Sequence, residues 1–181
     1  MAFTDRLTFL LDLNADGAIR GFNEVGRTAN RELGRTEDKL GEAFVGAAGE
    51  ELDEAIKSQE MEDLVFITNV VKCRPPMNMT PKSDQMTTCA NLYLYPEIQQ
   101  INPLVIVLLG VIAQSEFAHL WKKDRGRFHH VSLPLSVDRQ WKGIIVPTVH
   151  PSFVRRRKDV GDNKPLIKLR EDLALAKGFV V

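Results

Sequence analysis

The chain has 181 residues and 44% hydrophobic side chains, which is typical of one ordinary domain that buries its own core. Its longest apolar runs, 104–109 and 143–146, are too short to cross a bilayer, and the N-terminal residues lack the unbroken apolar stretch of a secretory signal. Basic and acidic residues number 24 each, so a formal net charge of zero gives no overall attraction to a polyanion such as nucleic acid.

The first third of the chain contains two predicted helices. Apolar residues at helical spacing after Thr4 and Asp5 predict a helix over 3–13, which ends at the turn-forming residues 14–17. Residues 18–46 show no clear pattern. A second helix is predicted over 49–56, because acidic residues at its start complement the helix dipole.

The remaining two thirds alternate strands with helices. Residues 64–71 are rich in β-branched and aromatic side chains without alternation, which predicts a strand buried on both faces. We expect the other elements to be a loop over 74–81, a helix over 83–100 broken before Pro96, a strand over 103–110, a helix over 111–120, a strand over 143–146 and a helix over 165–177. This alternation predicts an α/β fold in which helices cover both faces of a mostly parallel sheet.

Ligands of such folds bind beyond the carboxyl ends of the strands. Asn69, Gly110 and the segment 148–152 follow three predicted strands, so we expect chemistry at these positions.

Four motifs in the chain are similar, in their order, to those of one known family. They are Gly41–Gly49, Ile67–Pro76 followed by Asn78 and Pro81, Asn102–Gly110, and Pro147–Ser152 followed by Arg155. Together they resemble the uracil-DNA glycosylase superfamily, in particular its iron–sulfur branch, family 4. The resemblance implies one domain over 1–181, with a divergent segment over 1–40. It also implies a three-layer α/β/α fold around a mostly parallel four-stranded sheet.

The same resemblance implies a site for a base flipped out of DNA. Phe44 would stack on the base, and Asn69 would read the edge of uracil, because an amide offers both a donor and an acceptor. His150, the implied catalytic residue, would stabilise negative charge on a uracil carbonyl oxygen as the base leaves. The implied DNA contacts are Arg74, Pro75, Ser152, Arg155 and Arg156.

One departure from the family concerns a carboxylate. Family 4 carries a glutamate after its first core strand, where it positions water and stabilises the positive sugar. An alignment without gaps puts Arg31 at that position, and an alignment with an insertion puts Arg27 there. A cation would destabilise a positively charged transition state. Glu24, Glu32 or Glu37 would replace the glutamate only in a rebuilt loop.

A second departure concerns the metal cluster. Family 4 holds a [4Fe–4S] cluster with four cysteines, whereas this chain has two, Cys73 and Cys89, which match two of those ligands. Two thiolates do not complete such a cluster. We therefore expect no metal and no cofactor, with both thiols packed as small hydrophobic groups. The alternative is a metal shared between molecules.

The charges divide unevenly along the chain. Residues 1–63 have 7 basic and 15 acidic side chains, net −8, whereas residues 64–181 have 17 and 9, net +8. Ten basic residues lie within 120–158, against Asp124 and Asp138. This stretch surrounds the His-Pro-Ser motif, which favours salt-sensitive phosphate contacts over a merely solvated surface. We expect the acidic helix over 50–63 on another face, where it would repel DNA or bind a protein, and His129 and His130 in a surface loop.

Three hypotheses for the function follow. The first is a uracil-DNA glycosylase of base excision repair that binds single- or double-stranded DNA. The second is a catalytically impaired relative that binds DNA or a protein partner, and the third is a glycosylase with altered base specificity. In each case we expect a monomer without a membrane partner, located in the cytoplasm of a bacterial cell or a phage-infected host.

Overall fold

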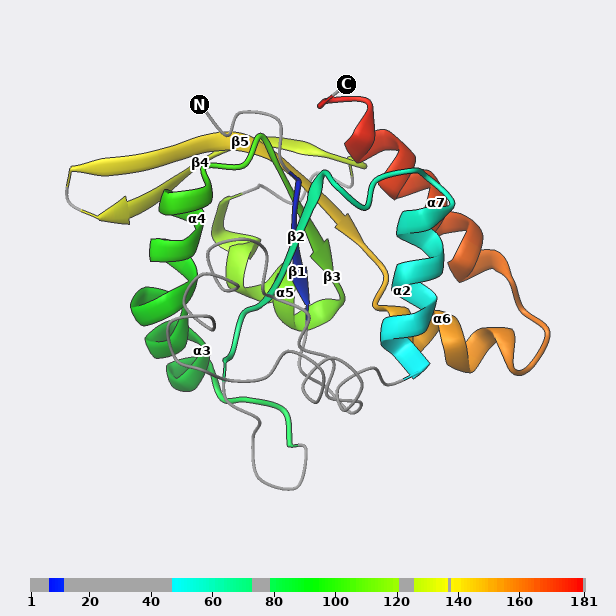
Figure 1. The fold of residues 1–181 in the computed structure, drawn as a ribbon. Helices are drawn as coiled ribbons and strands as arrows, with labels where there is room; N and C mark the ends of the chain where they lie inside the picture. Colours follow the sequence, from blue (N-terminus) through cyan, green and yellow to red (C-terminus); the bar gives the residue numbers. More distant parts are fainter. Residues whose placement is uncertain (1–6, 12–46, 73–78, 121–125, 137, 181) are drawn as a thin grey trace, which may run out of the picture.

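The computed structural model describes residues 7–11, 47–72, 79–120, 126–136 and 138–180, with the backbone alone for 7–11 and Ala47. A five-stranded sheet lies between two layers of helices (Figure 1). The predicted α/β class is therefore confirmed, whereas the expected number of four strands is wrong. Within the described residues no helix combines the length and the apolar character needed to cross a bilayer.

The sheet has the strand order β2-β1-β3-β5-β4. The four strands β2, β1, β3 and β5 run parallel, and β4 pairs antiparallel with β5 at one edge. The sheet is therefore mostly parallel, as predicted. The strands comprise β1 (Leu7–Leu11), β2 (Val65–Asn69), β3 (Val105–Leu109), β4 (His129–Ser136) and β5 (Arg139–Thr148).

Two sequence predictions of element type are wrong. The predicted helix over 3–13 contains β1, which pairs with β2 on one side and with β3 on the other. The spacing of a short apolar run is compatible with a helix or a strand. Here the segment forms a strand because it pairs with two neighbouring strands. His129 and His130 begin β4 and do not lie in a loop. Pro134 is tolerated within β4 because this strand lies at the sheet edge.

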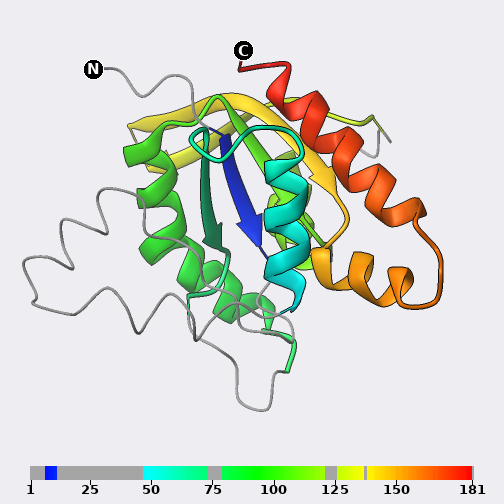
Figure 2. The ribbon, with the colours of Figure 1, turned by 45° about the vertical axis from the view of Figure 1, so that its right-hand side comes forward.

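The helices cover both faces of the sheet (Figure 2). The layer on one face contains α2 (Ala47–Lys57), α6 (Pro151–Lys158) and α7 (Lys164–Lys177). The other layer contains α3 (Ser83–Cys89), the π-helix η2 (Ala90–Leu94), α4 (Tyr95–Ile101), α5 (Val111–Phe117) and the 3-10 turn η3 (Ala118–Leu120). The helices predicted over 49–56, 111–120 and 165–177 are thus present with shifted ends.

The predicted break before Pro96 takes the form of a π-helical turn. The chain passes from α3 through η2 into α4 in consecutive residues, and Pro96 lies in the first turn of α4. Proline cannot donate a backbone hydrogen bond inside a helix, so the irregular turn directly before it accommodates the missing donor.

Side-chain alternation in the strands divides the core into two halves. Val105, Val107 and Leu109 of β3 pack in the core half that contains α2, α6 and α7. Ile106 and Leu108 pack in the half that contains α3, α4 and α5. All five residues of β3 are buried, as predicted for a strand covered on both faces.

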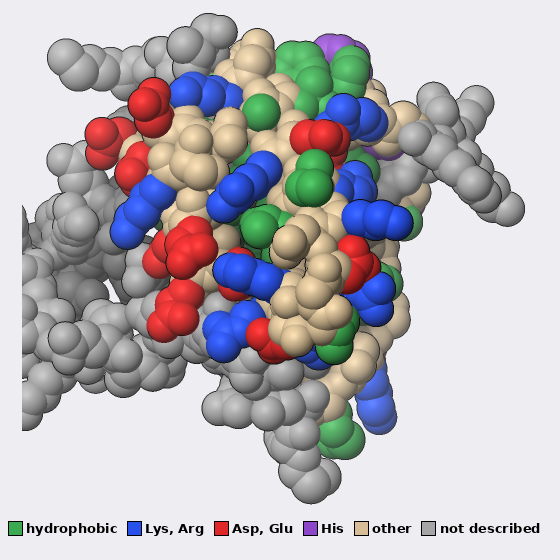
Figure 3. All heavy atoms as spheres, turned by 90° about the vertical axis from the view of Figure 1, so that its right-hand side faces the viewer, with side chains coloured by type: hydrophobic (Ala, Val, Ile, Leu, Met, Phe, Trp, Pro, Cys, Tyr) green, Lys and Arg blue, Asp and Glu red, His purple; other side chains and the backbone are tan. Residues whose placement is uncertain are grey.

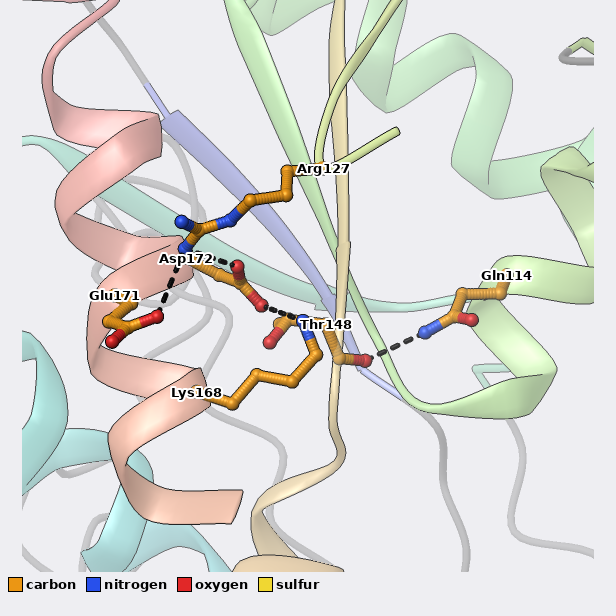
Figure 4. Close-up of polar contacts among 6 residues, drawn as sticks. All are labelled: Gln114, Arg127, Thr148, Lys168, Glu171 and Asp172. Atoms are coloured by element: carbon orange, nitrogen blue, oxygen red, sulfur yellow. Dashed lines mark hydrogen bonds and ion pairs between the residues drawn. The ribbon is translucent and has the colours of Figure 1, made fainter. Parts of the chain in front are cut away.

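A buried carboxylate connects the C-terminal helix to the segment before β4. Asp172 of α7 is fully buried, and its two oxygens accept from Arg127 Nη2 at 3.1 Å and from Lys168 Nζ at 2.7 Å (Figure 4). Arg127 Nη2 also lies 3.4 Å from a Glu171 oxygen. Because this charge is paired twice, its burial is compensated.

The acidic and basic helices lie side by side. Lys158 Nζ of α6 donates to Glu51 Oε1 of α2 at 2.8 Å. Figure 3 shows acidic and basic side chains interspersed on the face that these helices share with α7. The expectation that the acidic helix lies on a separate face is therefore wrong, because α2 packs directly against α6.

Candidate functional site

The carboxyl ends of the four parallel strands meet at one edge of the sheet. Asn69, Leu11, Leu109 and Thr148 are the final residues of these strands, and pairwise register places them in one row. Since neighbouring strands lie about 4.8 Å apart, the two ends of this row are roughly 14 Å apart. The predicted residues Asn69 and His150 therefore belong to the same edge, separated by two strands.

The Asn69 side chain is buried at this edge. Its side chain is 3% exposed, and its Oδ1 atom has no hydrogen-bond partner among the residues that the structure describes. A buried polar atom left without a partner costs about 1–3 kcal/mol, so a ligand that donates to this oxygen would remove that cost. Thr148 Oγ1, at the other end of the row, is also buried and has no hydrogen-bond partner within the described residues.

His150 caps the N-terminus of α6. Its Nδ1 accepts from the Ser152 backbone N–H at 3.0 Å and lies 2.7 Å from Ser152 Oγ. A backbone N–H only donates, so Nδ1 carries no proton in this arrangement, and the ring proton belongs on Nε2. Arg156 Nη1 lies 3.4 Å from Ser152 Oγ. Three predicted site residues, His150, Ser152 and Arg156, are thus in one chain of contacts.

Gly110 makes room for His150. It follows β3 with a φ of 90°, and a methyl group on its Cα would lie 2.9 Å from His150 Cβ. Its N–H donates to the Thr148 carbonyl at 3.1 Å. The end of β3 and the turn that carries His150 are therefore in direct contact.

The cations of α6 differ in their partners. Arg155, Arg157 and Lys158 pair with Asp159 at 3.6 Å, Asp162 at 2.5 Å and Glu51 at 2.8 Å, respectively. The hydrogen bond from Arg157 is the main cause of a lowered pKa of Asp162, and that to Glu51 is the main cause of a raised pKa of Lys158. Among the described residues no carboxylate pairs with Arg156, which contacts Ser152 instead.

Several predicted residues lie outside the described part of the chain. These are Phe44, Cys73, Arg74, Pro75, Asn78, Arg27 and Arg31. The two alignments of the missing glutamate, at Arg27 and at Arg31, therefore stay predictions.

The cysteines do not fit the cluster that the resemblance implies. Cys89 is 9% exposed in the core, and its Sγ accepts from the Lys72 backbone N–H at 3.1 Å. The whole chain has two cysteines, against the four thiolates of a [4Fe–4S] site. Within the described ranges no group of three or more His, Cys, Asp or Glu side chains could hold a metal ion.

Two polar groups near the site were missed by the sequence reasoning. Lys72 Nζ donates to Glu97 Oε2 at 2.6 Å and also contacts Thr68 Oγ1, which itself donates to Glu97 at 2.8 Å. Gln114 Nε2 donates to the Thr148 carbonyl at 2.7 Å. Both groups join segments far apart in sequence, and no local pattern signals such pairs.

Comparisons with known proteins show the family of the chain. The family model described as the uracil DNA glycosylase superfamily matches residues 31–174, most of the chain. The chain therefore belongs to the uracil-DNA glycosylase superfamily. Within it, the chain is similar to type-4 uracil-DNA glycosylases, which confirms the resemblance to family 4.

Three of these relatives illustrate the extent of the similarity. The type-4 uracil-DNA glycosylase of Thermotoga maritima is 37% identical over 151 residues, which cover 81% of this chain and 73% of the relative. That of Pyrobaculum aerophilum is 43% identical over 160 residues, covering 80% and 72%. That of Sulfurisphaera tokodaii is 40% identical over 126 residues, covering 66% and 56%. The similarity thus spans little more than half of one relative and nearly three quarters of the others.

Proposed function

We propose that this protein is a uracil-DNA glycosylase, which flips uracil out of DNA and hydrolyses its N-glycosidic bond in base excision repair. The observation that carries the proposal is the placement of two groups at one sheet edge. These are the Asn69 Oδ1 atom, which has no hydrogen-bond partner within the described part of the chain, and a His150 ring that accepts at Nδ1. The type-4 uracil-DNA glycosylases among the relatives support the same activity.

Asn69 would select uracil by hydrogen bonding. Uracil presents an N–H donor at N3 beside a carbonyl acceptor at O4, and the amide of Asn69 offers an acceptor and a donor that match this pair. Cytosine presents an amino donor at its C4 position and an acceptor at N3, so the same amide orientation would put like groups against each other. Burial of Asn69 makes such a mismatch costly, because water does not compensate it.

His150 would act on the leaving base. With Nδ1 occupied by Ser152, the Nε2–H group of the neutral ring is the donor for a uracil carbonyl oxygen. This oxygen gains negative charge as the glycosidic bond breaks, and one fixed donor of this kind contributes about 3–4 kcal/mol in other enzymes. Ser152 holds the ring in the required tautomer, and Arg156 contacts Ser152.

The remaining site residues have supporting roles in this proposal. Phe44 would stack on the flipped base, and the phosphate contacts would come from Arg74, Pro75, Ser152, Arg155 and Arg156. Arg156 is the strongest candidate among them, because the described residues provide no carboxylate that neutralises it.

The test is a cleavage assay with two matched substrates. A labelled single-stranded oligonucleotide with one deoxyuridine is incubated with the protein and treated with alkali, beside an oligonucleotide with thymidine at that position. We expect strand cleavage at uracil alone. His150→Ala and Asn69→Ala should each lower the rate at least about 100-fold. The exposed residues His119 and Asn91 provide matched controls, since His119→Ala and Asn91→Ala should leave it unchanged.

Two results would overturn the proposal. Full-length substrate at enzyme excess, with binding retained, would contradict the enzyme and leave a DNA-binding module. Undiminished cleavage by both site variants would show that Asn69 and His150 are not the catalytic groups.

A further inference from the structure

We infer that Gln114 is a positioning residue that holds His150 in its working place, an inference that rests on the proposed function of this site. Gln114 lies in the first turns of α5, and its side chain extends from that helix to the end of β5 (Figure 4). It reaches the chain two residues before His150, at Thr148.

Gln114 contacts a backbone carbonyl oxygen that accepts two hydrogen bonds. The Thr148 carbonyl accepts from Gln114 Nε2 at 2.7 Å and from the Gly110 N–H at 3.1 Å. A carbonyl oxygen has two lone pairs, so both are used, and both donors come from the junction of β3 and α5. Thr148 itself is 2% exposed, so water does not replace either donor easily. The junction thereby fixes the peptide from which the His150 turn departs.

The helix that carries Gln114 is anchored in turn. The Tyr95 hydroxyl of α4 donates to Glu116 Oε1 of α5 at 2.8 Å. Burial, together with the hydrogen bond to Glu116, raises the pKa of Tyr95 well above its ordinary value, so the hydroxyl keeps its proton at all working pH values. Gln114 therefore projects from a helix whose place against α4 is fixed.

The same helix layer also contacts the segment that carries Asn69. Glu97 of α4 accepts from Thr68 and Lys72, which flank Asn69 in sequence. A series of polar contacts therefore runs from the Asn69 strand through α4 and α5 to the His150 turn, on one face of the sheet. Gln114 is the last link, and it is the one that touches the His150 segment.

Loss of the Gln114 donor should loosen His150 without unfolding the protein. The Gly110 N–H still satisfies the Thr148 carbonyl, so no buried acceptor is left bare. A catalytic group misplaced by about 1 Å loses roughly 100-fold in rate, and a partial loosening should cost about tenfold. The effect should appear in kcat, because the His150 contact matters most when charge develops on the base.

The kinetic test uses Gln114→Met, which keeps the side-chain length and removes the donor. We expect kcat for uracil release to fall about tenfold, with KM and the melting temperature close to those of the wild-type protein. Gln100→Met changes an exposed glutamine of α4 and serves as the matched control. Gln114→Lys restores a donor and should recover part of the rate. An unchanged kcat in Gln114→Met, or a Gln114→Lys variant as slow as Gln114→Met, would overturn the inference.

A second measurement separates this inference from the proposed function. In protein labelled with nitrogen-15 histidine, the ring signals of His150, assigned by their loss in His150→Ala, should shift in Gln114→Met and stay in place in Gln100→Met. Signals that do not move, or that move together with those of His119, His129 and His130, would overturn the positioning role. A wild-type protein that releases no uracil would refute the proposed function, while these spectra would still decide the role of Gln114.

Discussion

The Gly110 backbone packs against the His150 side chain so closely that a methyl group on the Gly110 Cα would lie 2.9 Å from His150 Cβ. Gly110 has φ 90° and ψ 176°, a conformation that is essentially restricted to glycine. Two separate demands, one conformational and one steric, therefore require glycine at the end of β3. The steric demand comes from the proposed catalytic residue.

Gly110→Ala should abolish uracil release and also destabilise the protein. The backbone strain alone is expected to cost about 1–3 kcal/mol of unfolding free energy, and the new methyl group displaces His150. The measurements are the cleavage assay and thermal unfolding.

Gly161 provides the matched control for that variant. It has a φ of 80°, and an added Cβ would meet nothing within 4 Å. Gly161→Ala should therefore lower stability while leaving cleavage unchanged. Equal losses of activity in the two variants at a temperature where both are folded would contradict the steric role of Gly110.

Arg156 should dominate the contribution of α6 to DNA binding. Arg156→Gln should weaken binding to a uracil-free oligonucleotide and reduce the slope of log affinity against log salt by about one. Arg157→Gln is the matched change on the same helix. It should have a smaller effect, because Asp162 holds Arg157 through two hydrogen bonds. Fluorescence anisotropy at several salt concentrations measures both, and a larger slope change for Arg157→Gln would contradict the assignment.

The sequence predicted the sheet edge of this site well. β2 is rich in β-branched and aromatic residues and β3 is a continuous apolar run, and Asn69, Gly110 and His150 lie at or just beyond the ends of β2, β3 and β5, so the three could be assigned to one edge before any coordinates. The order of the strands in the sheet could not be predicted from the sequence. Leu7–Leu11 is central only because it pairs with strands more than fifty residues away, and spacing within the segment does not report such pairing.

The supporting contacts were inaccessible for a related reason. Gln114 binds a backbone carbonyl 34 positions away, and Lys158 pairs with Glu51 across 107 positions. Counting charges along the chain separated the acidic and basic parts in sequence, but the packing of α2 against α6 brings them together. Local sequence patterns therefore placed Asn69 and His150 after predicted strands, and the family resemblance implied their roles, but neither indicated the residues that contact these segments.

The ion pair between Glu51 of α2 and Lys158 of α6 should make the stability of the protein depend on pH in the alkaline range. The pKa of Lys158 is raised from its ordinary value of 10.5, chiefly by the hydrogen bond to Glu51. A pKa raised by folding stabilises the protein fully below the unfolded value, and this contribution is lost as pH rises through the folded value. Lys158→Met should therefore lower the melting temperature at pH 7, and the difference from the wild-type protein should shrink above about pH 10.5.

Lys57→Met is the control for that prediction, because Lys57 is exposed at the end of α2. It should change the melting temperature little at either pH. A difference between Lys158→Met and the wild-type protein that stays constant up to the highest pH would contradict the assigned role of the ion pair.

The environment of Cys89 predicts a structural thiol in place of a cluster ligand. Its Sγ accepts the Lys72 N–H, so Cys89→Ala leaves a donor without its partner and should cost about 1–3 kcal/mol of unfolding free energy. Because the chain has two cysteines, we expect the purified protein to lack bound iron and the broad visible absorbance of a [4Fe–4S] cluster. An iron chelator should then leave both the melting temperature and uracil release unchanged. Iron that copurifies with the wild-type protein and is lost in Cys89→Ala would show instead that Cys89 ligates a metal completed by groups from another molecule.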